Sequence, residues 1–532
     1  MSELNALSES DLRKDKLYLY YTQMGRCMYS GEPISLSDLY NDNLYDIDHI
    51  YPQSLTKDDS LNNRVLVKKT MNEEKGNLFP VPAGYRNKCS GLWKMLESGG
   101  FITKEKYFRL TRTDGFTPEE LSGFINRQLV ETRQSTKAAA QVLQSLYGQT
   151  VVFSKAGNVA DFRRDFGFVK VRELNDYHHA KDAYLNIVVG NVYDTKFTRN
   201  PINFIRDAKP GSYSLNRMYD YDVGSGNSLA WKSGKDRSIS TVRKTMNSNR
   251  ILFTRYSKET TGSFYDQMPM KKGSGQIPLK ASDPRFSNLE RYGGYNKDAT
   301  AYFFLVEYRE KNRTIRSIEC VPVRFAKKIA DDRNLLKEYC IKELKLSDPR
   351  IIIERIKINT LFKLDGFPMH ISGRTGNSVT FKCGAQLIIP QDQEIYLKKL
   401  VRFNERRRNG LAGEITAFDG ITAEENILLY DILTEKQRSS VYRNRPASQL
   451  DVMVKGREKF KKLSVEDQCT AIINILVLFK CVFARTDLKA IGGSGQAGTV
   501  SKNKNITACS QAEIIYQSVT GLFEKRINLL EL

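Results

Sequence analysis

Residues 45–77, YDIDHIYPQSLTKDDSLNNRVLVKKTMNEEKGN, constrain the fold of this chain more than any other stretch. Their composition predicts two short strands around a polar loop, followed by the start of a helix, at residues 46–50, 64–67 and 69–75. Asp48 and His49 are adjacent on the first strand, and Asn72 lies on the helix. A strand–loop–strand–helix unit of this length can fold Asn72 back beside Asp48.

These residue types suit the hydrolysis of a phosphodiester. The reaction needs a base that activates water and a cation that neutralises the leaving oxygen. Histidine, with a near-neutral pKa, is such a base, and carboxylate and amide oxygens bind Mg²⁺. The alternative interpretation is that His49 is a buried strand residue and that the asparagines belong to turns. Histidine is rare here, with only four in 532 residues, which indicates that it is not a common packing choice in this chain.

The strings KLYLYYTQMGR, YDIDHIYPQS, KDDSLNNRVLV and FINRQLVETRQ resemble the HNH module, and the linker after it, of the Cas nuclease of type II CRISPR systems. This resemblance implies that His49 is the general base and that Asp48 and Asn72 hold Mg²⁺, with Mn²⁺ as the alternative ion. It also implies that Asn63 supports the active site. The module would cut the DNA strand that pairs with the guide RNA.

A second candidate site lies in KVRELNDYHHAKDAYLN. His179 and Asp182 are three residues apart on a predicted helix and so share a face, which suits a metal-assisted hydrolase but is also typical of a surface hydrogen-bond pair. The string resembles the third RuvC segment of the same family. The resemblance implies that His179 is a base, that His179 and Asp182 serve a metal site, and that His178 is a structural neighbour. The family's RuvC site takes further acidic ligands from two earlier segments, so we expect this part to cut the displaced strand only together with them.

The charge of the chain indicates a nucleic-acid partner. Lys and Arg number 83 against 61 Asp and Glu, a net charge of +22, and such a surplus favours polyanions. A merely basic soluble protein is the alternative. The eight cysteines form no CxxC pair, as expected of reduced thiols in a bacterial cytoplasm, and Ser30 stands where a second zinc-binding cysteine would follow Cys27. The N-terminus is not a signal peptide, and residues 471–483 fall short of a membrane span.

The C-terminal region is predicted to be rich in strands from residue 300, with helices at residues 392–407, 422–433 and 465–483. ERYGGYNKDATAYFFLVEY and IIYQSVTGLFEKRINL resemble the start and end of the family's region that reads the PAM, a short duplex motif beside the target. The candidates for reading it are Gln496, Ser501, Lys502 and Lys504. Four arginines on or beside one predicted helix suit phosphate contacts, or are a solvated charge run: Arg402, Arg406, Arg407 and Arg408. A turn that grips a DNA phosphate is expected at residues 261–267.

Together these features predict an α+β, multi-domain chain. The expected parts are a ββα-metal HNH module, a linker, an incomplete RNase H-like RuvC part and a mixed, β-rich PAM-interacting domain, at residues 1–112, 113–132, 133–260 and 261–532. Residues 212–234 are predicted to be a loop. The expected partners are a guide RNA (crRNA with tracrRNA), target double-stranded DNA and the missing N-terminal half of the nuclease. Two alternatives stay open: a free-standing HNH nicking endonuclease that needs no guide, and a catalytically silent nucleic-acid-binding module.

Overall fold

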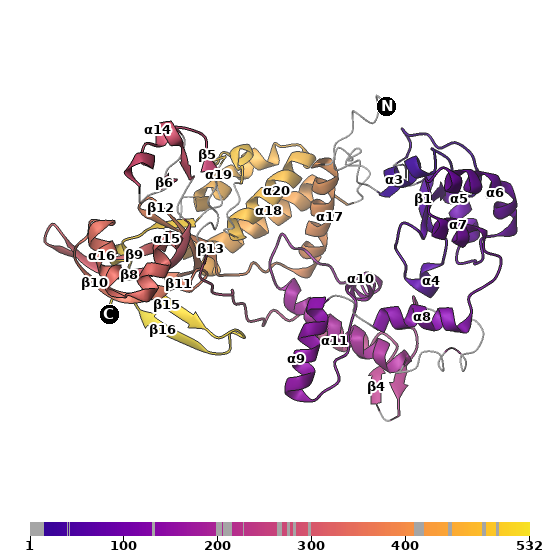
Figure 1. Ribbon diagram of the computed structural model, residues 1–532, viewed down its shortest axis with the longest axis horizontal. Coiled ribbons are helices and arrows are strands. Elements are labelled where there is room, and N and C mark those ends of the chain that lie inside the picture. The colour runs from indigo at the N-terminus through magenta and orange to yellow at the C-terminus, as the bar shows by residue number, and fades with distance from the viewer. Residues whose placement is uncertain are drawn as a thin grey trace. The chain divides into compact units, whose positions relative to one another are not determined.

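The computed structural model describes residues 15–532 except 40, 42, 130–133, 198–204, 206–214, 227, 263–268, 274–276, 280–282, 296–298, 409–419, 445–448, 481–485 and 496–499. Its secondary structure is mixed α and β, as predicted (Figure 1). The chain forms two compact units. Unit 1 consists of Met1–Phe168 and His179–Ser248, and unit 2 of Val169–His178 and Asn249–Leu532.

The first part of unit 1 has the predicted strand–loop–strand–helix order. Strand β1 (Tyr45–His49) pairs antiparallel with β2 (Arg64–Lys68), and α5 (Lys69–Lys75) follows β2 without a break. Both faces of β2 are covered by other parts of the domain, since the successive residues Val65, Leu66 and Val67 are all fully buried. The surrounding helices are α3 (Asp15–Thr22), α4 (Gln53–Thr56), α6 (Ala83–Ser98) and α7 (Lys104–Thr111). Trp93 of α6 is fully buried and donates from Nε1 to the Met28 carbonyl at 2.9 Å, and the Met28 amide donates to the Leu66 carbonyl of β2 at 3.2 Å, so Met28 links α6 to the hairpin.

The predicted linker, residues 113–132, packs into the same core. It contains α8 (Pro118–Leu129). Phe116 stacks on Phe79 with ring centroids 4.3 Å apart, and Phe124 meets Phe116 edge-on at 5.1 Å. This segment is therefore held against the hairpin domain by aromatic packing.

The rest of unit 1 is mostly helical. Its elements are α9 (Gln134–Tyr147), α10 (Ala156–Asp165), α11 (His178–Phe197), β3 (Val223–Ser225), β4 (Ser228–Trp231) and α13 (Ser238–Met246). The prediction that residues 212–234 are a loop was wrong in part, because β3 and β4 form a hairpin there. The reason is Trp231, which is 2% exposed and packs edge-on against Phe162 of α10, so one apolar side chain anchors a polar, Gly- and Ser-rich stretch.

The described residues of unit 2 form three sheets. A three-stranded sheet has the order β10–β8–β9, a six-stranded sheet the order β14–β13–β12–β11–β15–β16, and a small one the order β5–β7–β6. The strands are β5 (Pro269–Met270), β6 (Ile277–Pro278), β7 (Gly294–Tyr295), β8 (Thr300–Glu310), β9 (Arg313–Pro322), β10 (Ser347–Ile356), β11 (Leu361–Leu364), β12 (Phe367–Thr375), β13 (Ser378–Cys383), β14 (Val500–Asn503), β15 (Ala512–Gln517) and β16 (Glu524–Asn528). The predicted change to strands from residue 300 is confirmed.

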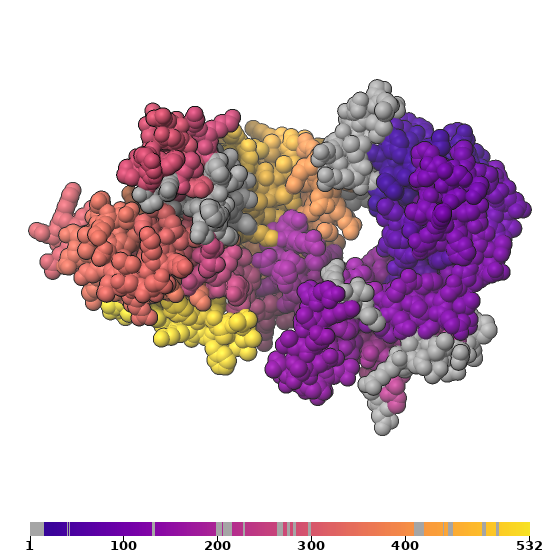
Figure 2. Space-filling view, viewed as in Figure 1, coloured from indigo at the N-terminus to yellow at the C-terminus, as the bar shows by residue number. Residues whose placement is uncertain are grey.

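The described helices of unit 2 are α14 (Leu289–Tyr292), α15 (Val323–Asp331), α16 (Asn334–Lys342), α17 (Gln391–Arg408), α18 (Ala423–Arg438), α19 (Gln449–Lys461) and α20 (Val465–Lys480). Of these, α15 and α16 pack against the three-stranded sheet, where their buried residues share a core with β8 and β9. The helices predicted near residues 392, 422 and 465 are thus confirmed, and Thr422 caps α18 by accepting from the Glu425 amide. Buried residues of α17, α18 and α20 share one core with β11–β13, and the space-filling view shows the helical and strand-rich parts of unit 2 against each other (Figure 2).

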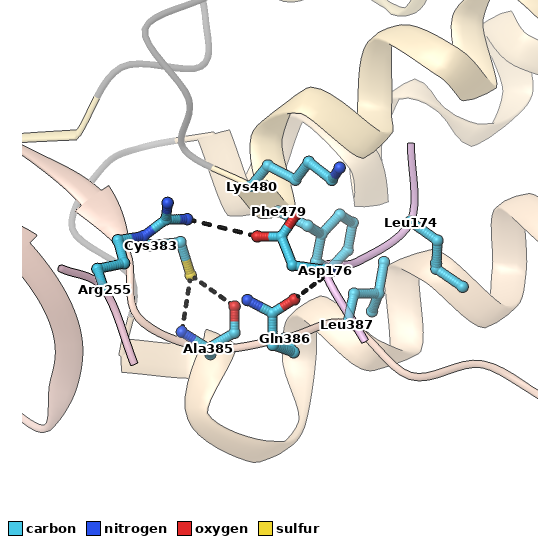
Figure 3. Close-up of a pocket in the computed structure, with 9 residues that line it drawn as sticks. All are labelled: Leu174, Asp176, Arg255, Cys383, Ala385, Gln386, Leu387, Phe479 and Lys480. Atoms are coloured by element: carbon cyan, nitrogen blue, oxygen red, sulfur yellow. Dashed lines mark hydrogen bonds and ion pairs between the residues drawn. The ribbon is translucent and has the colours of Figure 1, made fainter. Parts of the chain in front are cut away.

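Residues Val169–His178, which lead into the first residue of α11, belong to unit 2, although the sequence placed them in the RuvC segment. Val171 and Leu174 join the main core of that unit. Asn175 donates to the Leu387 carbonyl at 2.8 Å, and the Asp176 amide donates to the Gln386 side chain at 2.7 Å. Figure 3 shows Asp176 between Gln386 and Arg255. These residues line a cavity whose volume is about 200 Å³. The chain therefore passes through unit 2 immediately before the candidate RuvC helix α11.

Two expected absences concern the described part of the chain. The seven cysteines within it carry free thiols. None of its helices combines the length and the apolar character needed to cross a membrane.

Candidate active site

Helix α5 lies across one face of β1 and brings four polar side chains together. Successive strand residues point to opposite faces, so Asp46 and Asp48 share one face of β1. Asn72 and Lys75 are three apart on α5 and so share a helix face. Asn72 donates from Nδ2 to Oδ2 of Asp46 at 2.7 Å, and Lys75 Nζ lies 3.0 Å from Oδ2 of Asp48. Two residues about one helical turn apart thus align with two alternate positions of the strand.

Asp48 is the more enclosed of the two carboxylates. Its side chain is 7% exposed, and the Lys75 side chain is fully buried. The hydroxyl of Tyr29 donates to Oδ2 of Asp48 at 2.5 Å. Burial, with the Asp48 charge and this hydrogen bond, raises the pKa of Tyr29 well above its usual range. Asp48 is therefore a buried carboxylate that is neutralised by a buried ammonium group.

The sequence predicted that Asn72 returns to Asp48, whereas its amide contacts Asp46. Asp46 was missed, although its place two residues before Asp48 signals a shared strand face. The amide of Asn72 donates through its nitrogen, so its oxygen is not used in this hydrogen bond. The carboxylate oxygens of Asp46 and Asp48 are donors of the kind that a hard divalent cation prefers, and in this structure they bond to the Asn72 amide nitrogen and to the Lys75 ammonium group.

His49 belongs to the opposite side of the strand end. Its side chain is 22% exposed, and Nε2 lies 2.9 Å from Oδ1 of Asp59 in the β1–β2 loop. The side-chain nitrogen of Gln53 lies 2.9 Å from the same ring nitrogen. Sequence reasoning missed Asp59 and Gln53, and only the folded loop brings them to the ring. The His49 ring thus follows Asp48 directly in sequence, and its hydrogen-bond partners belong to the β1–β2 loop rather than to the acidic face.

Asn63 supports the loop through the backbone. It is fully buried, its Oδ1 accepts from the Tyr51 amide at 2.8 Å, and its Nδ2 donates to the carbonyls of Tyr51 and Asp58, both at 2.9 Å. Its own carbonyl accepts from the Ile50 amide at 2.8 Å. Asn63 therefore sets the path of the chain directly after His49.

The second candidate site lies on the first turns of α11, as predicted, with His179 and Asp182 on one helix. Arg163 of α10 donates from Nε and Nη2 to Oδ1 of Asp182, at 2.9 and 2.6 Å. His178 places Nδ1 3.0 Å from the Asn175 carbonyl, as fits a structural neighbour. No cluster of three or more acidic, histidine or cysteine side chains suited to a metal occurs anywhere in the described part of the chain.

The residues predicted to read a duplex lie around β14. Lys502 pairs with Asp365 at 2.5 Å, and Lys504 pairs with Glu319 at 2.7 Å. Glu319 is completely buried and also binds Arg374 at 2.5 Å, a residue that the sequence did not single out. Ser501 is exposed on β14. Gln496 and residues 263–267 of the predicted phosphate turn lie outside the described residues.

The arginines predicted to meet phosphates lie in the second half of α17 and are exposed: Arg402, Arg406, Arg407 and Arg408. Arg407 bonds to Asp467 of α20 at 3.1 Å. Part of this charge is therefore balanced within the unit.

Comparison with known families matches three ranges of the chain. Residues 27–81 match HNH endonucleases, residues 133–217 the Cas9 RuvC domain, and residues 261–525 the PAM-interacting domain of the CRISPR-associated endonuclease Cas9. The hairpin with His49, the helix with Asp182 and the sheet with Lys502 each fall within a matched range.

Individual relatives agree with these matches. The CRISPR-associated endonuclease Cas9 of Streptococcus mutans is 27% identical over 99% of this chain and 40% of its own length. That of Listeria innocua is 26% identical over 98% of this chain and 39% of its own length. That of Staphylococcus aureus is 34% identical over 32% of this chain and 18% of its own length. The chain thus spans about two fifths of the curated relatives that it matches along its length.

Proposed function

Because the chain belongs to the family of CRISPR-associated Cas9 endonucleases, we propose that it provides the strand-cutting and PAM-reading parts of an RNA-guided DNA endonuclease. Its setting is antiviral defence in a bacterial cytoplasm, and its partners are a guide RNA (crRNA with tracrRNA), target double-stranded DNA and the rest of the nuclease. The net charge of +22 supports contacts with both nucleic acids.

The observation that supports this proposal is that one strand–strand–helix unit carries both His49 and a face with the two carboxylates Asp46 and Asp48. His49 takes a proton from the attacking water, and Asp48 and Asn72, with Asp46, hold a divalent cation. Mg²⁺ fits these donors best, with Mn²⁺ as the alternative, and when bound it stabilises the charge on the leaving oxygen. Lys75 keeps the Asp48 carboxylate in place. The strand cut here is the one paired with the guide.

In the RuvC part, which we propose is RNase H-like, His179 acts as a base and Asp182 as a metal ligand. Arg163 supports this role by holding Asp182 in one orientation. One carboxylate does not suffice for two divalent cations, so further acidic ligands are required before the displaced strand is cut.

The sheet around β14 reads the PAM. Ser501, Lys502, Lys504 and Gln496 remain the candidates, and Arg374 joins them because it shares the buried Glu319 with Lys504. Guanidinium and ammonium groups bind guanine edges in the major groove. The exposed arginines of α17 are candidates for phosphate contacts.

The deciding experiment is His49→Ala in the complex with guide RNA, Mg²⁺ and a matching duplex labelled on each strand. We expect nicking of the guide-paired strand to be lost and DNA binding to be retained, because the variant removes the base and no phosphate contact. Unchanged cleavage of that strand would refute the assignment. Cutting without guide RNA would favour a free-standing HNH enzyme, which the matches at residues 133–217 and 261–525 argue against.

A further inference from the structure

The histidine of the HNH site has a carboxylate partner that the proposed mechanism does not use. Nε2 of His49 lies 2.9 Å from Oδ1 of Asp59. We propose that Asp59 is a positioning residue, which holds the imidazole in the tautomer protonated at Nε2 and leaves Nδ1 as the atom that accepts the proton of the water. This inference rests on the proposed role of His49 as the general base.

The tautomer follows from the chemistry of the partner. An ionised carboxylate only accepts hydrogen bonds, so the ring nitrogen that faces Asp59 carries the proton. A protonated Nε2 does not accept a hydrogen bond from Gln53, and the amide of Gln53 donates to Asp59 instead. Both donors thus converge on one carboxylate oxygen, and the remaining lone pair of the ring is on Nδ1.

The side chain of Asp59 is 74% exposed, so its position has to come from the loop that carries it. That loop, residues 57–63, is held by α7. Arg109 donates from Nη1 to Oδ2 of Asp58 at 2.7 Å, and Lys106 donates from Nζ to the Leu61 carbonyl at 3.2 Å. Both basic side chains are buried, at 8% and 4% exposure.

The other loop residues are fixed as well. Thr103 donates to Oδ1 of Asn62 at 2.8 Å, and Nδ2 of Asn62 donates to Glu105 at 2.7 Å. Burial raises the pKa of Asp58, but hydrogen bonds from Ser60 and Arg109 outweigh it, so the net shift is downward. Hydrogen bonds hold Asp58 on one side of Asp59 and residues 60–63 on the other. The loop backbone between them therefore places Asp59 beside the imidazole of His49. An exposed pair without such a frame exchanges readily with water.

A spectroscopic test reads the tautomer without any cleavage. The chain has only four histidines, so ¹⁵N-histidine labelling gives a spectrum that single His→Ala variants assign. Long-range ¹H–¹⁵N couplings distinguish an Nε2-protonated from an Nδ1-protonated ring. We expect His49 to be Nε2-protonated in the wild type and in Asp59→Glu, and a mixture of tautomers in Asp59→Ala. An unchanged ring in Asp59→Ala would overturn the proposal.

A kinetic test uses the guide-loaded complex. At saturating DNA, Asp59→Ala should slow the cutting of the guide-paired strand by about 10- to 100-fold, as the loss of a group that orients a reacting residue does, with DNA affinity unchanged and partial rescue by Asp59→Glu. Asp38→Ala, an exposed carboxylate of the same domain, is the matched control and should cut at the wild-type rate. If Asp59→Ala cuts at the wild-type rate while His49→Ala is inactive, this proposal fails and the proposed function stands. If His49→Ala itself cuts normally, both fail.

Discussion

At the scale of single residues, the histidines of this chain serve different purposes. His49 and His179 lie at the candidate sites, whereas His370 of β12 is 1% exposed and lies with Nδ1 2.8 Å from the Asn359 carbonyl. Burial lowers the pKa of His370 from 6.5 to about 4, and the charges of Arg255 and Lys382 add to this effect. The rarity of histidine in the sequence suggested that it is not used for packing, and His370 is a packing histidine nonetheless.

His370 makes unit 2 sensitive to acid. The unfolded chain takes up a proton near pH 6.5, while the folded chain resists it until about pH 4, so the stability contributed by His370 is complete above pH 6.5 and is lost as the pH falls toward 4. The largest loss is about 3 kcal/mol. Hydrogen exchange of the β11–β12 amides at pH 7 and pH 4.5 measures it. His370→Gln should show a smaller difference between the two pH values than the wild type, and equal differences would contradict the assignment.

At the scale of elements, close approach of backbones explains a glycine inside a helix. Gly456 lies in α19, where glycine costs about 1 kcal/mol relative to alanine. A Cβ at this position would lie 2.5 Å from the carbonyl oxygen of Ile491, in the 3₁₀ turn Lys489–Ile491. The helix therefore gives up intrinsic stability to pack closely on that turn.

Gly456→Ala should destabilise unit 2, by about 1–3 kcal/mol, because overpacking outweighs the gain in helix propensity. Gly91→Ala is the opposite case, since Gly91 is exposed inside α6 and nothing lies within 4 Å of its Cβ position. It should stabilise the hairpin domain by about 1 kcal/mol. Urea titrations measure the change in the free energy of unfolding of both variants. Unfolding is followed by circular dichroism, and for Gly91→Ala also by the fluorescence of the nearby Trp93. Stabilisation by Gly456→Ala would contradict the close contact between α19 and the turn.

Local sequence patterns predicted the helices and strands of the candidate site, but they did not predict which side chains contact each other between those elements. Strand β1, strand β2 and α5 follow from alternation, turn residues and helix formers within 30 residues of sequence. The alignment of Asn72 with Asp46 rather than Asp48 depends on how α5 crosses the strand, which no local pattern encodes. Lys504 was singled out in the sequence, but its buried partner Glu319 is on β9, far away along the chain. The tertiary fold alone brings such charges together.

At the scale of the whole molecule, the two candidate nuclease sites differ in completeness. The hairpin site has its proposed base and its proposed oxygen donors within residues 46–72. The α11 site has, among the described residues, one carboxylate in a bond with an arginine. We therefore expect strand-specific behaviour from a guide-loaded complex.

The chain alone should leave the displaced strand uncut, and adding the remaining RuvC segments in trans should restore cutting of that strand. Duplexes labelled on the displaced strand measure this, with Asp182→Ala as the control that should abolish the restored activity. The expectation would be contradicted if the chain alone cut the displaced strand and Asp182→Ala abolished that cutting, because the α11 site would then need no further ligands.

The path of the chain also decides how the protein can be engineered in pieces. It enters unit 2 at Val169, leaves after His178 and returns at Asn249. If the gene were divided after residue 248, residues 169–178 would be part of the N-terminal product. The C-terminal product would then lack Val171 and Leu174, which belong to its main core. A two-plasmid version therefore has to graft residues 169–178 onto the C-terminal product, or supply them as a peptide that completes it.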